Sequence, residues 1–192
     1  MPPFFYCINI HTQLNLEKSM TALDNIPENK NFLSPLNFRF QIKKCPNVNF
    51  FLQNVNIPGM VLTGPEQPNP FVRIPKAGDH IDFDDLMINY KVDEDLQNYL
   101  ELYNWIRELG FPNNFDEYKS IASQPVYTGL GISSDISLII LTSSRNPNYE
   151  VVFKDAFPIS ISSLIFDSTQ PDVQFLEASA TFKYRSYSIQ KM

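Results

Sequence analysis

The side chains best suited to chemistry in this sequence lie between positions 79 and 85. Asp79, Asp82, Asp84 and Asp85 surround His80, and closely spaced carboxylates are ligands that Ca²⁺ or Mg²⁺ prefers. The spacing does not match an EF-hand loop, and no glycine stands where that loop must bend. The alternative is a solvated acidic edge that leads into a strand. We therefore predict no metal site and keep the four aspartates as the only candidate ligands. A hydrolase with paired carboxylates is less favoured still, because nothing places two acids in one cleft.

The other reactive residue types are scattered along the chain. The histidines are His11 and His80, and the cysteines are Cys7 and Cys45, without a CxxC spacing. Cys45 has no base nearby and is interpreted as a structural thiol. No HExxH, GxSxG, GxGxxG or GxxxxGK[ST] pattern occurs. We therefore predict a non-catalytic protein that needs no cofactor.

The composition favours one strand-rich domain. The 192 residues are 43% hydrophobic and 14% aromatic, with sixteen Phe and nine Tyr, and these aromatic types suit pleated, half-buried surfaces. A net charge of −6 and a pI of about 4.9 disfavour a typical nucleic-acid binder, because an acidic surface gains little from counterion release. No apolar run approaches the ~20 residues of a membrane span. Residues 1–10 lack the basic start and the cleavage site of a signal peptide.

The pattern of side chains predicts strands in the first half of the domain, after an arm at residues 1–33. Phe38, Phe40 and Ile42 alternate with polar residues, as in a strand with one buried face. Residues 48–57 are predicted to be a strand with apolar groups on both faces, which must be buried from both sides. Residues 58–70, rich in Pro and Gly, are predicted to be a loop or an irregular edge. Further strands are predicted at 71–74 and 83–92.

One helix is predicted at about 94–109. Apolar side chains recur there at helical spacing, and Gly110 and Pro112 are stop signals. Asp93, Glu94 and Asp95 suit the positive end of the helix dipole, and Asp93 or Asp95 is the expected N-cap. Aromatic residues on this helix are interpreted as core or interface, not as a ligand box. They are Tyr99, Tyr103 and Trp105.

The second half is predicted to be strand-rich. Residues 135–153 read as a hairpin, because Arg145-Asn146-Pro147-Asn148 is a strong turn signal between two apolar segments. A strand is predicted at 159–166, followed by a turn and a long final strand at 174–188. The predicted fold class is therefore mainly β (α+β), a β-sandwich or barrel flanked by one helix.

Three segments together resemble the tail tube protein family of contractile-tailed bacteriophages. FRFQIKKCPNVNFFLQNVNIPGM (38–60) is similar to the family's opening strand pair, and RIPKAGDHIDFDDLMINYKVDEDLQNYLELYNWI (73–106) to its Gly-Asp turn, strand and acidic helix start. YEVVFKDAFPISISSLIFDSTQPDVQFLEASATFKY (149–184) looks like its closing strands. The resemblance covers about 36–188 and leaves two additions: the arm at 1–33, and an apparent insertion at about 111–133 within the domain at 34–192.

The resemblance implies a virion structural protein of a phage tail. Six copies would form a ring, and stacked rings would form the inner tail tube through which the genome leaves. The expected partners are further copies of the chain and adjacent tube, sheath or baseplate proteins, with DNA passing unbound and no membrane. Assembly would take place in the host cytoplasm. The expected subunit-interface residues are Phe38, Phe40, Val48, Phe50, Phe51, Leu52, Val55, Ile57, Leu138, Ile140, Tyr149 and Val151.

Two alternatives stay open. Within the same family, the chain could be a baseplate tube-initiator or a tube-cap ring, and the two additions favour such a specialised member. More remotely, the strand pattern also suits a monomeric β-barrel that holds a small ligand in a closed cavity.

Overall fold

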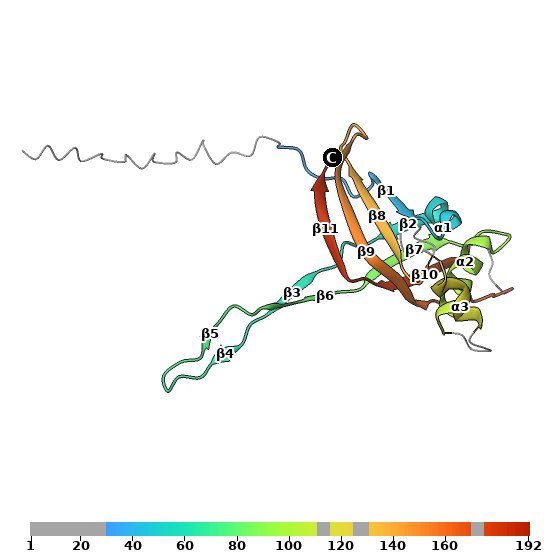
Figure 1. The fold of residues 1–192 in the computed structure, drawn as a ribbon. Coiled ribbons are helices and arrows are strands. Elements are labelled where there is room, and N and C mark those ends of the chain that lie inside the picture. Colours follow the sequence, from blue (N-terminus) through green and yellow to red (C-terminus); the bar gives the residue numbers. More distant parts are fainter. Residues whose placement is uncertain (1–29, 111–115, 125–130, 170–174) are drawn as a thin grey trace, which may run out of the picture. The chain divides into compact units, whose positions relative to one another are not determined.

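The computed structural model describes residues 30–110, 116–124, 131–169 and 175–192. The contacts within the chain divide it into Met1–Leu33 and Ser34–Met192, and the fold given below is that of the second unit (Figure 1). Most of the predicted arm and parts of the predicted insertion lie outside the described residues.

The first sheet consists of four antiparallel strands. In order across the sheet they are β1 (Phe38–Ile42), β8 (Ser134–Leu141), the first part of β9 (Pro147–Ile161) and β11 (Ser186–Lys191). Phe40, Leu138, Val151 and Ile189 lie side by side in one row across these strands, so their side chains share one face. The hairpin predicted at 135–153 is confirmed by the pairing of β8 with β9.

The end of β9 continues into a second antiparallel sheet. Beyond β9 it contains, in order, β10 (Glu177–Lys183), β7 (Leu86–Lys91) and β2 (Leu52–Val55). Strand β9 thus belongs to both sheets, and the prediction of a mainly β fold is confirmed. The sheets do not close into a barrel, because β1 and β2 stand at the two ends of the strand order and are not paired.

A bend in β9 at Asp155 carries the chain from the first sheet to the second. Asp155 has a φ of 55°, a left-handed conformation that Asp tolerates better than most residues. Its N–H donates to Oδ1 of Asp135 at 3.2 Å. The neighbouring strand breaks between β10 and β11, where the N–H of Arg185 donates to the carbonyl of Lys154 at 3.0 Å. Both strands of the ribbon therefore bend at the same place, as at a β-bulge.

The inner faces of the two sheets and helix α2 (Gln97–Gly110) enclose one core. Trp105 of α2 is buried, its ring centroid lies 6.2 Å from that of Phe182, and its indole N–H donates to the carbonyl of Ile132 at 3.1 Å. The interpretation of Trp105 as a core residue is thereby confirmed, whereas Tyr103 is exposed. No helix among the described residues is long and apolar enough to cross a membrane.

The start of α2 differs from the prediction. The helix begins at Gln97 and has no acidic residue in its first turn, so neither Asp93 nor Asp95 is its N-cap. Leu96 has a φ of 57°, and helical geometry cannot continue back through it. The buried side-chain amide of Asn98 instead forms hydrogen bonds with the backbone of this turn. Its Oδ1 accepts the N–H of Asp93 at 3.2 Å, and its Nδ2 donates to the carbonyl of Lys91 at 2.7 Å.

Residues 48–57 are not one strand, as predicted. Pro46–Phe51 form a short helix, α1, with Pro at its start, and the strand β2 covers only Leu52–Val55. The apolar residues point in several directions because they lie on a helix: Val48 is buried, whereas Phe50 is 83% exposed. The carboxylate of Glu101 on α2 accepts the backbone N–H of Asn47 at 3.2 Å and so ties α1 to α2.

A long hairpin connects β2 to β7. Its legs pair as β3 (Met60–Thr63) with β6 (His80–Phe83), and as β4 (Glu66–Gln67) with β5 (Ile74–Pro75). A Cβ atom at Gly78 would lie 1.4 Å from the carbonyl oxygen of Thr63, so only glycine permits this approach of the legs. Figure 1 shows the hairpin projecting away from the sheets. The loop predicted at 58–70 and the strand predicted at 71–74 are therefore wrong.

Three other predicted strands have different bounds. The strand at 83–92 is divided where the hairpin leg ends and β7 begins. Of the strand predicted at 159–166, only the first three residues are strand; they form the end of β9, which passes through Pro158 at a register shift beside β10. The strand at 174–188 is divided into β10 and β11 by the bend. A further helix, α3 (Asp116–Ala122), lies within the predicted insertion.

The bend in β9 predicts how substitutions at Asp155 act. Asp155→Val should lower the free energy of unfolding by about 1–3 kcal/mol, because a β-branched residue is strained at this φ. Asp155→Gly should cost far less, although it also removes the side chain that lies 3.7 Å from Arg185. Urea denaturation of both variants checks the difference. Equal destabilisation by Val and Gly would show that the side chain of Asp155 matters and its backbone conformation does not.

Candidate assembly interface

The predicted metal ligands lie on and beside β6, the second leg of the hairpin. Nε2 of His80 lies 3.3 Å from Oδ1 of Asp82, and the other oxygen of Asp82 accepts a hydrogen bond from Thr63 at 3.3 Å. Asp85 instead pairs with Lys183 of β10. Within the described ranges, no three His, Cys, Asp or Glu side chains are grouped so that they could hold a metal ion.

Cys45 lies at the junction of β1 and α1 and is fully buried. The pKa of its thiol is raised to about 12, mainly by burial and to a lesser extent by the nearby Glu101 carboxylate, while Lys44 opposes the shift. A nucleophilic cysteine requires a lowered pKa and access to solvent. The arrangement around Cys45 therefore fits a structural thiol.

The predicted interface residues divide into core and surface residues. Val48, Leu138 and Val151 are buried in the subunit's own core, and Phe40 is exposed only to 5%. The others are at least partly accessible. Phe38, Leu52, Val55 and Ile140 pack against the core from its margin, Phe51 is half-buried, and Phe50, Ile57 and Tyr149 are exposed.

One free edge of the first sheet is β1, whose outer side pairs with no strand among the described residues. Backbone groups of successive residues in an antiparallel strand point alternately to the two sides. Asn37 points toward β8, since its carbonyl accepts the N–H of Leu141 at 3.0 Å. Ile42 points away from β8, toward the side-chain amide of Asn49. The N–H and C=O groups of Phe38 and Phe40 therefore face the open side of β1.

The opposite free edge of this sheet is β11. The N–H of Met192 donates to the carbonyl of Asn148 at 3.0 Å, so the even-numbered residues of β11 bond to β9. The backbone groups of Tyr187, Ile189 and Lys191 consequently face outward. The side chain of Ile189 shares the core-side face with Phe40 in the row described above.

These two edges complement one another in direction and in face. The four strands alternate in direction, so β1 and β11 run opposite ways, and β11 of a rotated copy would lie antiparallel to β1. On both strands, the residues with outward backbone groups carry their side chains on the core side. A second copy can therefore extend the sheet without a bulge or a reversal of faces. Unpaired edges of this kind are templates for another chain.

The hairpin is a second surface that the single subunit leaves uncovered. Phe71 at its tip is 96% exposed, and apolar side chains on both of its faces are also exposed. They are Met60, Val61, Leu62, Val72, Ile74 and Ile81. A two-stranded ribbon with no sheet or helix beneath it is marginally stable in water. An apolar ribbon of this length is typical of an element that packs against a partner.

The base of the hairpin is fixed to the first sheet by two tyrosines. The hydroxyl of Tyr187 on β11 donates to the carbonyl of Pro58 at 3.1 Å, before the first leg. The hydroxyl of Tyr184 donates to the carbonyl of Asp84 at 2.8 Å, after the last leg. Burial is the main cause that raises the pKa of Tyr184 to about 12, so this donor keeps its proton at neutral pH. The direction in which the hairpin leaves the subunit therefore depends on the strand that also forms the free edge.

The face of the first sheet that is turned away from the core is mostly polar, with Ile139 and Val152 among its residues, and its charges balance. Strand alternation places Arg39, Asp135, Glu150 and Lys154 on that face. Their two positive and two negative charges cancel. The net charge of −6 for the chain is therefore not concentrated on this surface.

The chain belongs to the phage tail tube protein family, whose model matches residues 6–190. Its role is that of a structural component of a phage tail. A search of the curated proteins finds no match. The match reaches back into the predicted arm, so most of residues 1–33 belong to the family's own length.

Solved structures of contractile assemblies have a similar fold. A chain of the anti-feeding prophage tube-terminating cap has 12% identity and a TM-score of 0.55, with 90% of this chain and 100% of that chain covered. A chain of the anti-feeding prophage baseplate has 13% identity and a TM-score of 0.53, with coverage of 80% and 90%. A chain of the sheath-tube complex of an extracellular contractile injection system, PVC, has 12% identity and a TM-score of 0.52, with coverage of 85% and 94%.

The sequence did not reveal the hairpin or the edge strand β11. The signal for the hairpin is the repeat of Gly64 and Gly78 at facing positions, where added Cβ atoms would lie 2.8 Å and 1.4 Å from the opposite backbone. The signal for β11 is the Arg185-Ser186 step between two aromatic residues, which marks the bend that separates it from β10.

The environment of Cys45 predicts that its thiol is inert in the folded protein. In a Cys7→Ser variant, an aromatic disulfide reagent at pH 8 should label Cys45 only after denaturant is added, because the folded thiol is buried and its pKa is about 12. The raised pKa also adds stability that is complete at neutral pH and is lost as the pH rises from 9 towards 12. Cys45→Ala should make the loss of stability over that range less steep. Rapid labelling without denaturant would contradict this structural interpretation.

Proposed function

We propose that the chain forms six-membered rings that stack into the inner tube of a contractile phage tail. One observation carries the proposal: the four-stranded sheet ends in two unpaired edges, β1 and β11, that complement each other in direction and face. Because each subunit offers two different edges, the contact is head-to-tail, and such contacts close into rings when the rotation permits. The number six rests on the family resemblance.

The even number of strands makes such a ring possible. With alternating directions, a sheet of four strands has edges that run opposite ways. Pure rotation then continues the antiparallel alternation from one subunit to the next. With an odd number of strands, the two edges would run the same way and the rotated copies would meet as a parallel pair. A closed ring also removes both exposed edges, which otherwise favour aggregation.

In this arrangement the polar face of the first sheet lines the channel. The charges of Arg39 and Lys154 are balanced there by Asp135 and Glu150. DNA would gain little free energy from counterion release on such a wall. The balanced surface suits a conduit through which a genome passes without specific binding. The second sheet, α1 and α2 would lie outside, where sheath or baseplate proteins are the expected partners.

The hairpin is the element best suited to contacts between rings. It projects away from the two sheets, from a base that Tyr187 of β11 holds (Figure 1), and its exposed apolar side chains need a surface to cover them. We place these side chains against a copy of the chain in the adjacent ring. The predicted location in the virion, after assembly in the host cytoplasm, follows from this role.

A specialised ring is the second candidate function. A chain of a tube-terminating cap and a chain of a baseplate are among the solved structures that resemble this fold, with TM-scores of 0.55 and 0.53. The monomeric ligand-binding barrel has less support, since the sheets do not close around a cavity.

Blocking the free edge of β11 should prevent ring formation. In Lys191→Pro, the lost N–H is one that faces outward, so the bonds to β9 remain and the subunit should stay folded. Lys191→Ala removes the charge but keeps the N–H. Sedimentation should show rings for Lys191→Ala and monomers for Lys191→Pro, with similar urea midpoints. Intact rings in the proline variant would contradict the pairing of β11 with β1.

Removing the apolar side chain at the hairpin tip should separate stacking from ring formation. Phe71→Ser changes a residue that is 96% exposed, so folding and ring formation should be unaffected. Electron microscopy of the purified protein should show long tubes for the original chain and isolated rings or short stacks for the variant. Tubes of normal length would contradict the role of the tip. Isolated rings of the original chain would instead favour the initiator or cap.

A further inference from the structure

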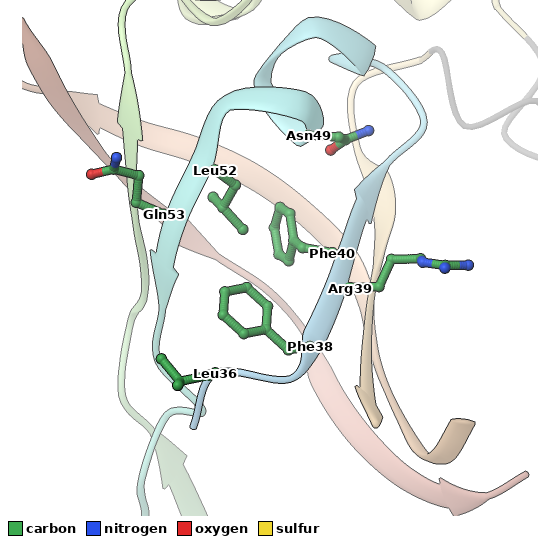
Figure 2. A pocket seen from close by; sticks show the side chains of 7 residues that line it. All are labelled: Leu36, Phe38, Arg39, Phe40, Asn49, Leu52 and Gln53. Atoms are coloured by element: carbon green, nitrogen blue, oxygen red, sulfur yellow. The ribbon is translucent and has the colours of Figure 1, made fainter. Parts of the chain in front are cut away.

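A groove runs along the free edge of β1, between that strand and the segment formed by α1 and β2. Its volume is about 370 Å³. Leu36, Phe38, Phe40 and Leu52 provide its apolar walls, and Figure 2 shows the rings of Phe38 and Phe40 pointing toward Leu52 across it. The groove lies where the two sheets fail to meet, since β1 and β2 are not hydrogen-bonded to each other. A single subunit thus leaves a gap between β1 and β2, in which these apolar side chains lie beside the polar residues Arg39, Asn49 and Gln53.

Beside the groove lie backbone groups of β1 that no described strand pairs with. Phe38 and Phe40 direct their N–H and C=O groups to the open side of β1, as shown above, and their side chains face the core side. A strand added there would place its own outward-bonded residues opposite Phe38 and Phe40, with side chains on the same face. Those side chains would enter the groove. The occupant must therefore be a strand that carries an apolar residue at a matching position.

The polar groups around the groove limit the register of this strand. Oδ1 of Asn49 accepts the N–H of Ile42 at 2.8 Å, and its Nδ2 donates to the carbonyl of Ile42 at 3.0 Å. The amide of Asn49 thereby occupies the edge of β1 at Ile42, as the backbone of a paired strand would. An added strand can pair only with the part of β1 before Ile42, which is the part beside the groove.

Strand β11 carries one side chain that fits this position. Of its residues with outward backbone groups, Tyr187 is held in its own subunit by the hydrogen bond to Pro58, and Lys191 is charged. Ile189 is apolar and 56% exposed, although it lies on the core-side face of the sheet. Its exposure has a simple cause, because no strand of the same subunit covers that margin of the sheet.

We infer that the groove of one subunit receives Ile189 from β11 of the next subunit in the ring, with Asn49 confining the pairing to the part of β1 before Ile42. This inference rests on the proposed ring and assigns the side-chain contact at its seam. The added strand completes the core wall that a single chain leaves open between β1 and β2. The contact makes the correct pairing distinguishable from a strand shifted by one residue, which would direct polar Ser188 or Gln190 into the groove.

The test is a cross-link between Ile189 and the far wall of the groove. In a Cys7→Ser background, Leu52→Cys combined with Ile189→Cys and treated with a short bismaleimide should give a ladder of covalent oligomers on a denaturing gel. The matched control combines Leu52→Cys with Gln190→Cys. Residue 190 is adjacent in sequence, but its side chain lies on the other face of the sheet, so this pair should not form the ladder. Equal ladders for both pairs would overturn the inference.

A charge at the same position provides a second measurement. Ile189→Asp should raise the concentration needed for half-assembly about ten-fold or more, because an unpaired carboxylate would be buried in the groove. Gln190→Asp, on the opposite face, should change this concentration far less.

Sedimentation of the original chain separates the failure of the proposed ring from the failure of the groove contact. If it shows no rings, the proposed ring fails. If rings form but Ile189→Asp assembles normally and the cross-link is absent, only the groove contact fails.

Discussion

The structure depends on one strand that belongs to two sheets. Strand β9 pairs with β8 and β11 over its first part and with β10 over its last part, and the bend at Asp155 lets it do both. Without that bend, the inner faces of the two sheets could not enclose a common core that includes Phe153 and Phe182. The same bend divides the last segment of the chain into β10 and β11, and so produces a separate strand at the sheet edge.

The core is closed on the side of β9, where the two sheets are continuous, and is open on the side of β1 and β2. The two sheets are joined through β9, while β1 and β2 at the opposite side are not paired. Within the described residues, this leaves unpaired backbone groups along β1 and a groove beside them. A monomeric protein would cover such an edge with a helix, a charge or a bulge. Among the described residues, Asn49 covers the end of the edge at Ile42, which is compatible with pairing of the rest of β1 to a further strand.

The hairpin and the sheet edge are mechanically linked. Tyr187 belongs to β11, packs against Phe153 in a tilted arrangement with a centroid distance of 5.6 Å, and donates to the carbonyl of Pro58 at the base of the hairpin. Tyr184 holds the other leg through Asp84. A strand that pairs with β11 would thus lie next to the residues that orient the hairpin. In the proposed tube, contacts within a ring and contacts between rings would meet at these two tyrosines.

The sequence by itself determined the strand-rich class, the place of α2, the β8–β9 hairpin and the family resemblance. These features are set by local patterns: alternation in 135–153, helical spacing around Leu102 and Trp105, and the turn residues between strands.

Only the tertiary structure decided which residues face a partner. Alternation marks one face of a strand as apolar, but it does not distinguish a core residue such as Val151 from an edge residue such as Ile189, because that difference depends on which strand lies alongside. Local pattern also failed at 48–57 and 58–75, where Pro46 starts a helix and where distant legs of the hairpin pair through their backbones. Long-range hydrogen bonds and burial determine which residues form strands and which stay exposed, and neither can be read from a few neighbouring residues.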